Sequence, residues 1–466
     1  MDFRIENDFL GQKSISNQVY WGIHTQRALE NFGYGIQSVP QGLIRALAKV
    51  KKACCQANLD LGYLSSDIAE PILMVCDEII NGKLMDQFPL NGLQGGAGTS
   101  VNMNMNEVIA NRVLEIMGIE KGEYEHCHPI EHVNLHQSTN DVYPTALKIA
   151  AIEAIRNLSK NIAEFQAQLQ KKEKQFGSDI VIGRTQLQEA VPITLGAQFS
   201  TYADAIARDR WRTFKSEERL RVVNIGGTAA GTGLTAPRSY IFLAIEKLRE
   251  VTGYGVTRGD NLMDQTANAD VFAEVSGILG AHAVNLEKIS NDLRLYNLLS
   301  ELKLPAVQTG SSIMPGKVNP VIPEAIISSS IKVSANNKII SDCAARGSFQ
   351  INEFLPLIAL SLLESVTLLS NSDKMLTEYV KNIEANSVNC EKHTSSSTTL
   401  ITAFLPYIGY KKAESLVDEF NNLVDIEFRE FLAKKLGAQL VNRILSPEEI
   451  MALGYKENDM KEFLKE

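Results

Sequence analysis

Residues 144–169, which read PTALKIAAIEAIRNLSKNIAEFQAQL, are the best guide to the architecture of this chain. Apolar side chains recur there at steps of 4, 4, 3, 4, 3 and 4 residues, at Leu147, Ala151, Ile155, Leu158, Ile162, Phe165 and Leu169. This spacing places them on one stripe of a single long helix after Pro144. At about 1.5 Å per residue, such a helix runs on the order of 45 Å.

The same spacing continues along much of the chain. It predicts further long helices over about 194–221, 262–300, 319–345 and 355–383, whereas strict alternation of apolar and polar residues is brief and rare. Helices of this length, joined by short connectors, form a bundle rather than a globular cluster. The sequence therefore predicts an all-α fold with a central bundle of five long helices.

Shorter helical patterns flank the predicted bundle and divide the chain into three parts. We expect an N-terminal helical domain at 1–140, the bundle at 141–390 and a small C-terminal domain at 391–466. The pattern over 271–290 is apolar on more than one face. Because such a helix needs partners on several sides, we expect the chain to form an oligomer.

Composition narrows the class of protein. The chain has 466 residues, of which 44% are hydrophobic, and a formal net charge of −9. Its basic residues are scattered among acidic ones, so the attraction that nucleic acids need is missing. The amino terminus, Met1–Glu6, is polar and acidic where a secretory signal is basic and then apolar, and no uninterrupted apolar run reaches the ~20 residues that span a bilayer. We therefore expect a cytoplasmic protein without membrane or nucleic-acid partners, whose six cysteines form no disulfides.

The most informative polar string is GSSIMPGKVNP at 310–320. Its two glycines and two prolines are incompatible with a continuous helix, so it is predicted to be a loop between helices. Such a loop can bring hydroxyls, an ammonium group and an amide to one ligand. Its chemistry alone fits an ordinary interhelical connector at least as well.

Three other polar strings stand before or between predicted helices. They are GGAGTS at 95–100, QSTND at 137–141 and GRTQLQ at 183–188. The first exposes backbone N–H groups at a helix start, which suits a carboxylate or a phosphate. The second provides more polar side chains than a helix cap requires. Taken singly, the first and third are explained equally well as a flexible turn and a connector.

Together these strings resemble the aspartase and fumarase superfamily. The superfamily signature G-S-S-x-x-P-x-K-x-N is met without a mismatch by Gly310–Asn319. The resemblance follows the expected order from Tyr20–Arg27 to Pro406–Tyr410. It implies the three-domain fold of that superfamily, with a 20-helix core in a homotetramer whose composite active sites draw on three subunits.

Within the superfamily, three of these strings look like those of aspartate ammonia-lyases. They are Gly-Gly-Ala-Gly-Thr-Ser at 95–100, Ser-Thr-Asn-Asp at 138–141 and Thr-Gln-Leu-Gln at 185–188. Gln186 stands where a fumarase is expected to place a histidine. A neutral amide can accept a hydrogen bond from an ammonium group but cannot shuttle protons to or from water. The resemblance thus implies the reversible deamination of L-aspartate, a small-molecule dicarboxylate substrate, to fumarate and ammonia.

The resemblance also implies roles for individual residues, with no cofactor and no metal. Ser311 would be the base that removes the Cβ proton, which generates an aci-carboxylate intermediate. Donors to that intermediate would be Thr99, Ser138, Thr139 and Ser312. The α-carboxylate would be held by Lys317 and Asn319. The amino group would be received by Asn140, Thr185 and Gln186.

Two features depart from the family pattern. The stretch 297–305 is shorter than its counterparts and lacks their Ser-Gly-Pro-Arg-x-Gly sequence. Four histidines crowd around Cys127 at spacings that could suit zinc, although Pro129 interrupts any single helix through them. The alternatives are therefore an amine lyase for another amino acid, a class II fumarate hydratase and, least favoured, a catalytically silent scaffold.

Overall fold

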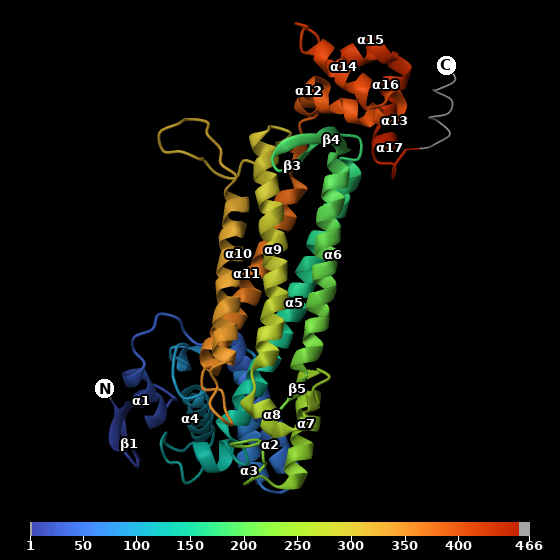
Figure 1. The fold of residues 1–466 in the computed structure, drawn as a ribbon. Coiled ribbons are helices and arrows are strands. Elements are labelled where there is room, and N and C mark those ends of the chain that lie inside the picture. Colours follow the sequence, from blue (N-terminus) through green and yellow to red (C-terminus); the bar gives the residue numbers. More distant parts are fainter. Residues whose placement is uncertain (1, 456–466) are drawn as a thin grey trace. The chain divides into compact units, whose positions relative to one another are not determined.

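The computed structural model of the protein describes residues 2–455. They are mostly helical, and Figure 1 labels many of their elements. The chain divides into two compact units, each built from three segments. Unit 1 comprises Met1–Lys160, Trp211–Ala283 and Ile331–Ser370. Unit 2 comprises Asn161–Arg210, Val284–Ser330 and Asn371–Glu466. The three-domain division at 140 and 390 stays a prediction.

The predicted long helices are present. They are α5 (Thr139–Gln175), α6 (Leu195–Leu220), α9 (Asp270–Leu298), α10 (Val321–Ala344) and α11 (Leu355–Lys381). The apolar stripe predicted for α5 is buried along its whole length, which confirms the period assigned to it. Each Leu, Ile or Phe side chain of the stripe contributes about 1.5–3 kcal/mol when it leaves water.

One helix boundary was predicted wrongly. The single helix expected over 262–300 is two helices, α8 (Leu262–Ala267) and α9. The break falls at Asn268, whose backbone is extended with φ −100° and ψ 140°. Asn side chains compete for backbone hydrogen bonds and so favour helix ends, which apolar periodicity does not report.

Helix α11 is apolar enough to span a membrane by length and composition, although Glu364 and several serines interrupt its apolar run. However, 67% of its most apolar window is buried inside the structure. A buried helix of a folded core has the same composition as a membrane span. We therefore describe α11 as a core helix.

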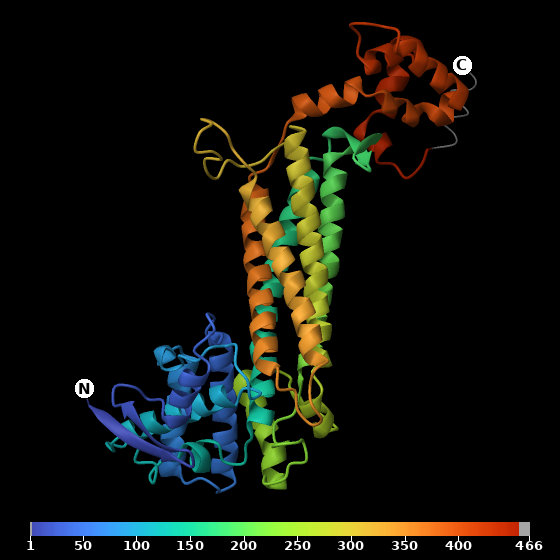
Figure 2. The same cartoon turned by 60° about the vertical axis from the view of Figure 1, so that its left-hand side comes forward.

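Unit 1 contains the N-terminal elements, and Figure 2 shows its β1–β2 hairpin in blue. Helix α2 packs against α3 and α7, and α4 packs against α1 and α3. The short strands β5 and β6 pair in parallel. The elements other than the long helices are β1 (Phe3–Asp8), β2 (Gly11–Ser16), α1 (Ile23–Asn31), α2 (Gln41–Asp60), α3 (Ser66–Ile80), η1 (Met85–Gln87), α4 (Thr99–Ile116), η2 (Pro129–Val133), β5 (Val222–Val223), α7 (Arg238–Thr252), β6 (Thr257–Arg258) and α8.

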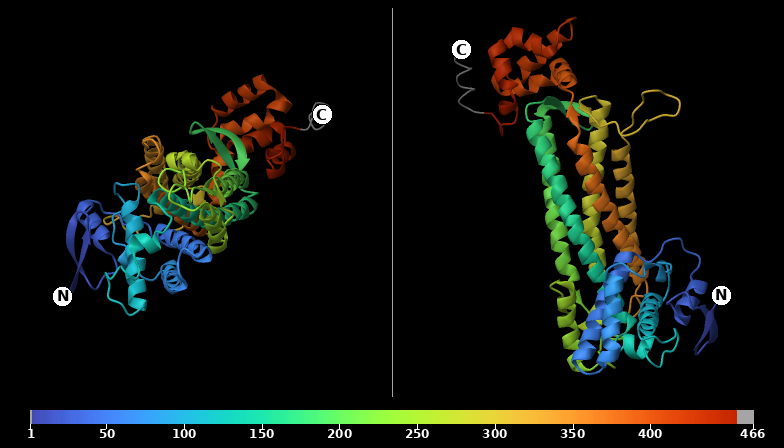
Figure 3. Two further views of the ribbon diagram at one scale, coloured as in Figure 1. Left: turned by 90° about the horizontal axis from the view of Figure 1, so that it is seen from below. Right: turned by 180° about the vertical axis from the view of Figure 1, so that it is seen from behind.

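Unit 2 contains two antiparallel strand pairs and a cluster of short helices, drawn in red in Figure 3. Phe404, Phe428 and Phe431 form the centre of the core of this cluster. The strands are β3 (Ile180–Thr185) with β4 (Gln188–Thr194) and β7 (Leu302–Lys303) with β8 (Glu384–Ala385). The short helices are α12 (Ser387–Ser396), η3 (Thr398–Phe404), α13 (Leu405–Ile408), α14 (Tyr410–Phe420), α15 (Phe428–Leu436), α16 (Ala438–Ile444) and α17 (Pro447–Ile450).

A buried carboxylate from α4 replaces the missing cap of α1. Gly22, at the N-cap of α1, has no side chain to cap the helix. Glu107 accepts hydrogen bonds from the backbone N–H groups of Gly22, His24 and Thr25 at 2.9, 2.7 and 3.1 Å. It also accepts the Thr25 hydroxyl at 2.6 Å. The first N–H groups of a helix need such partners, so Glu107 joins α1 to α4.

We predict that Glu107→Gln lowers the free energy of unfolding at pH 8 by about 2 kcal/mol. The glutamine amide keeps one acceptor oxygen, but its NH2 group replaces the other. The backbone N–H groups that donated to that second oxygen then have no acceptor. Urea denaturation measures the difference. The control is Glu125→Gln, because Glu125 is exposed and a surface change alters stability by at most about 0.5 kcal/mol. Equal stability of the two variants would contradict the capping role.

Candidate active site

The first turns of α4 and α5 meet in unit 1. Thr99 and Thr139 are the first residues of these helices, and the Asn102 side-chain amide donates a hydrogen bond to the Thr139 hydroxyl oxygen at 3.1 Å. Gly98 has a left-handed φ of 92°, and a Cβ there would lie 2.4 Å from the Tyr143 ring, so glycine permits this approach. Two long helices thus direct their positive N-terminal ends to one region, which suits a carboxylate.

Hydrogen bonds within the protein decide which side-chain atoms of residues 138–140 remain free to donate or to accept. The Ser138 hydroxyl oxygen accepts from the Asn140 backbone N–H at 3.2 Å, and the Thr139 oxygen accepts from Asn102. A hydroxyl that accepts still has its own hydrogen to donate. Asn140 donates through Nδ2 to the Ala229 carbonyl at 2.7 Å, which leaves Oδ1 as an acceptor. Two donors and one acceptor of this kind match a carboxylate and an ammonium group.

The buried carboxylate of Asp141 holds this turn from behind. Its two oxygens accept the backbone N–H groups of Ser138 and Thr228, each at 3.0 Å. Burial raises the pKa of Asp141 to about 6, although these two N–H groups act in the opposite direction. The glycine-rich string at 226–233 is a series of turns. Its role in holding Asp141 was missed, because it depends on a contact 87 residues apart along the chain.

In unit 2, Thr185 and Gln186 lie at the tip of the β3–β4 hairpin rather than in a plain connector. Thr185 pairs with Gln188, so Gln186 and Leu187 form a two-residue turn. Both have positive φ, 53° and 63°. Such turns favour Asn-Gly, and a non-glycine residue in this conformation costs about 1–3 kcal/mol. Backbone strain of this kind concentrates at functional sites.

An ion-pair cluster supports the hairpin. Arg184, next to the tip, donates to both carboxylate oxygens of Glu301, at 2.8 and 2.7 Å. His393 on α12 hydrogen-bonds the same carboxylate through Nδ1 at 2.9 Å. The Glu301 side chain is fully buried and belongs to the stretch 297–305 that departs from the family pattern. The sequence alone gave Arg184, Glu301 and His393 no shared role, because only the fold brings them together.

The string at 310–320 is a loop, as predicted. Its ends are closed by two hydrogen bonds, from the Gly310 N–H to the Lys317 carbonyl at 2.7 Å and from Asn319 Nδ2 to the Gly310 carbonyl at 2.8 Å. Inside the loop, the Ser311 hydroxyl oxygen accepts the backbone N–H groups of Ile313 and Met314 at 3.1 and 2.9 Å. Ser312 and Lys317 are exposed. The loop therefore surrounds one hydroxyl oxygen with donors.

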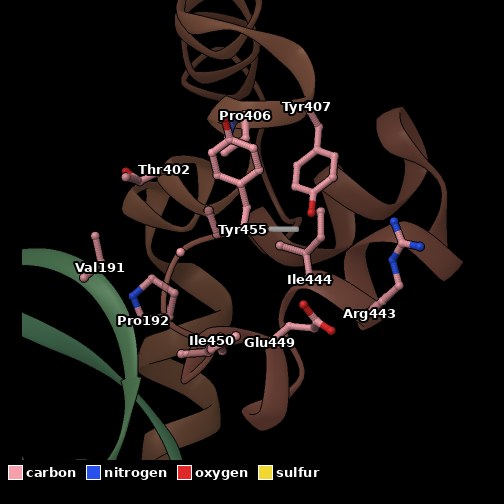
Figure 4. A pocket seen from close by; sticks show the side chains of 13 residues that line it. Val191, Pro192, Thr402, Pro406, Tyr407, Arg443, Ile444, Glu449, Ile450 and Tyr455 are labelled. Atoms are coloured by element: carbon pink, nitrogen blue, oxygen red, sulfur yellow. The ribbon is translucent and has the colours of Figure 1, made fainter. Parts of the chain in front are cut away.

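Two cavities in unit 2 differ in their relation to the predicted residues. One, of about 320 Å³, lies at the base of the loop at 310–320. It is bordered by Asn319, by Tyr379 and by residues of the stretch 297–305. The other, of about 270 Å³, lies between β4 and the short helices, with Arg443 and Glu449 on its wall (Figure 4). None of the predicted site residues lines this second cavity.

Three of the four histidines near Cys127 make hydrogen bonds within the protein. His128 accepts the Ile130 and Glu131 N–H groups through Nδ1, both at 3.1 Å. His132 Nδ1 accepts the His128 N–H at 2.9 Å, and His136 is hydrogen-bonded to Asn58 at 2.7 Å. Within residues 2–455, no group of three or more His, Cys, Asp or Glu side chains is placed to hold a metal ion.

The chain is similar to known proteins in sequence and in fold. A family model described as lyase matches residues 11–335. The chain is 42% identical to an aspartate ammonia-lyase of a Bacillus species, over 96% of this chain and 97% of the relative. A structure of a fumarate lyase:delta crystallin from Brucella melitensis matches with TM-score 0.92 and 40% identity, over 97% and 100% of the two chains. A class II fumarase from Schistosoma mansoni gives TM-score 0.89 and 29% identity, over 98% and 100%.

We predict that Glu301→Gln lowers the free energy of unfolding by about 3 kcal/mol, because it leaves the charge of Arg184 without its partner. Urea denaturation is the measurement. The matched control is Glu391→Gln in the same unit, where the Glu391 side chain is 59% exposed and pairs with Arg429. Loss of that surface pair should change stability by less than about 1 kcal/mol. Similar losses in both variants would show that the cluster does not support the hairpin.

Proposed function

Because the chain belongs to this lyase family and matches curated aspartate ammonia-lyases over nearly its whole length, we propose that it deaminates L-aspartate to fumarate, with Ser311 as base. The expected reaction class, a carbon–nitrogen lyase, is confirmed by these relatives. They also favour the ammonia-lyase over the fumarate hydratase, because the solved class II fumarase is only 29% identical. The mechanism below is our proposal.

The environment of the Ser311 oxygen is the observation that supports the proposed base. A serine hydroxyl in water is a poor base, so the protein must stabilise its deprotonated form. The two N–H groups of Ile313 and Met314 already point at Ser311 Oγ. Donors that hold the charged form lower the pKa of an acid. The ammonium of Lys317, in the same loop, is the nearest cation along the sequence.

Proton removal creates charge that needs donors. The Cβ–H bond breaks, its hydrogen passes to Ser311 Oγ as a proton, and its electron pair spreads into the β-carboxylate. The resulting aci-carboxylate is a dianion. The donors that we assign to it are Thr99, Ser138, Thr139 and Ser312, and one such preorganised donor contributes on the order of 3 kcal/mol.

Collapse of this intermediate expels ammonia. The electron pair returns to form the Cα–Cβ double bond, the Cα–N bond breaks, and nitrogen leaves with the bonding pair as neutral ammonia. The ammonium group of the substrate would be held by Asn140, Thr185 and Gln186, and the α-carboxylate by Lys317 and Asn319. Holding both carboxylates selects a four-carbon diacid. These steps use no metal and no cofactor.

We also propose a homotetramer in which different subunits complete each site, built around a 20-helix core. The long helices carry large apolar side chains that a single chain leaves in water, such as Phe214 on α6, Val284 on α9 and Ile331 on α10, each about 60% exposed. Apolar surface of this kind is typical of subunit interfaces. The residues assigned to the site are divided between units 1 and 2. The proposed compartment is the cytoplasm.

We predict that Ser311→Ala lowers kcat for aspartate by on the order of 10³-fold or more, because the base is removed. The rise in absorbance of the fumarate double bond and the release of ammonia measure the rate. The exposed Ser328 on α10, whose hydroxyl donates to the Glu324 carbonyl, gives the control Ser328→Ala, which should retain full rate.

The same assay distinguishes the remaining candidates. Aspartate should give both fumarate and ammonia, whereas malate should give no fumarate. Turnover of malate would favour the hydratase, and silence with aspartate but turnover of another amino acid would favour a related amine lyase. A Ser311→Ala variant that keeps full rate would remove Ser311 from the role of base.

A further inference from the structure

Lys51 on α2 is a buried ion to which the proposed mechanism assigns no role. Its residue is 1% exposed, and its ammonium donates to Asn134 Oδ1 at 2.8 Å and to Gln137 Oε1 at 2.9 Å. Burial lowers the pKa of Lys51 to about 8, so the group is still charged at neutral pH. Lysine is almost never fully buried without a paired partner. Both of its partners lie in the turn just before Ser138.

The Asn134 oxygen is the centre of a buried network. It also accepts the side-chain amides of Asn102 and Asn106, both at 3.2 Å. The same Asn102 nitrogen donates to the Thr139 hydroxyl oxygen at 3.1 Å. On its other side, Asn134 donates through Nδ2 to the Gln137 carbonyl at 3.1 Å. A continuous path of hydrogen bonds therefore runs from Lys51 to Thr139.

Lys51 sets the donor-to-acceptor direction of the hydrogen bonds along this path. An ammonium group can only donate, whereas an amide side chain can present either oxygen or nitrogen. Lys51 therefore requires Asn134 to turn its oxygen inward, and this oxygen in turn requires Asn102 to present its nitrogen. Thr139 then accepts, and its own hydrogen points away from the network.

We propose that Lys51 is a positioning residue that, through Asn134 and Asn102, keeps the Thr139 hydroxyl hydrogen directed at the substrate. Asn102 Oδ1 is buried and has no hydrogen-bond partner among residues 2–455. If the amide of Asn102 reversed, this oxygen would face Thr139 and take its hydrogen. Lys51 prevents that reversal. The inference rests on the proposed function, in which Thr139 donates to the aci-carboxylate.

A double-mutant cycle on kcat tests the path. Thr139→Val removes one donor and should lower kcat on the order of 10²-fold. Lys51→Met lets the side chains of the network reorient and should also lower kcat, on the order of 10²-fold. KM should change less than about threefold, because the hydrogen bond from Thr139 to the substrate strengthens in the transition state. If Lys51 acts through Thr139, the double variant is no slower than Thr139→Val alone. Multiplied losses, on the order of 10⁴-fold, would overturn the proposal.

A matched control separates positioning from folding. Lys148 is also buried in unit 1, and its ammonium donates to the Val222 carbonyl and to Gln265. Lys148→Met should lower the melting temperature, as Lys51→Met does, yet leave kcat within about twofold of wild type. If Lys51→Met does not fold, Asn102→Leu, which has similar volume and no donor, replaces it in the same cycle.

The proposal and the function fail in different ways. Wild type that forms no fumarate from aspartate contradicts the proposed function. If the wild-type enzyme is active and a folded Lys51→Met variant keeps full kcat, only the role of Lys51 is contradicted. A loss of kcat in Lys148→Met equal to that in Lys51→Met would show a structural effect of lysine burial and would also overturn the proposal.

Discussion

The requirement that buried polar groups find partners governs the arrangement of the polar clusters. Asp141 lies behind the turn at 138–140, and Glu301 lies behind the β3–β4 hairpin. Both carboxylates are buried, so each needs N–H groups or cations from other parts of the chain as partners. By doing so they fix segments that local sequence would leave as flexible connectors.

This constraint also gives the polar side chains a direction. Serine, threonine and asparagine each have donors and acceptors, and a ligand meets only those that the protein has not used. The protein occupies the acceptor side of Ser138 and Thr139 and the donor side of Asn140. It thereby leaves two hydrogens and one oxygen, which is the complement of a substrate with a carboxylate and an ammonium group. In the loop, backbone N–H groups point at Ser311 Oγ, which is the oxygen that has to carry charge.

Much of the fold was predictable because apolar periodicity is a local signal. The stripe from Leu147 to Leu169 identified α5, and the glycines and prolines of 310–320 identified the loop. The break at Asn268 was missed, since one polar residue hardly disturbs a long apolar pattern. The β3–β4 hairpin was missed as well, because Gln186 and Leu187 carry none of the turn residues that positive φ normally selects. The four histidines near Cys127 resembled a metal site by spacing alone, whereas His128, His132 and His136 use a ring nitrogen in a backbone or side-chain hydrogen bond.

By itself, the sequence determined the helical class, the positions of the polar strings and, through a signature matched in full, the family and reaction class. These properties depend on residues close together along the chain or on a contiguous motif. Only the tertiary structure decided which atoms are available: that Lys51 reaches Asn134, that Asn102 reaches Thr139 and that Glu301 pairs with Arg184. These pairs lie from 37 to 117 residues apart. Hydrogen-bond polarity depends on which groups are buried together, and no local pattern of residues carries that information.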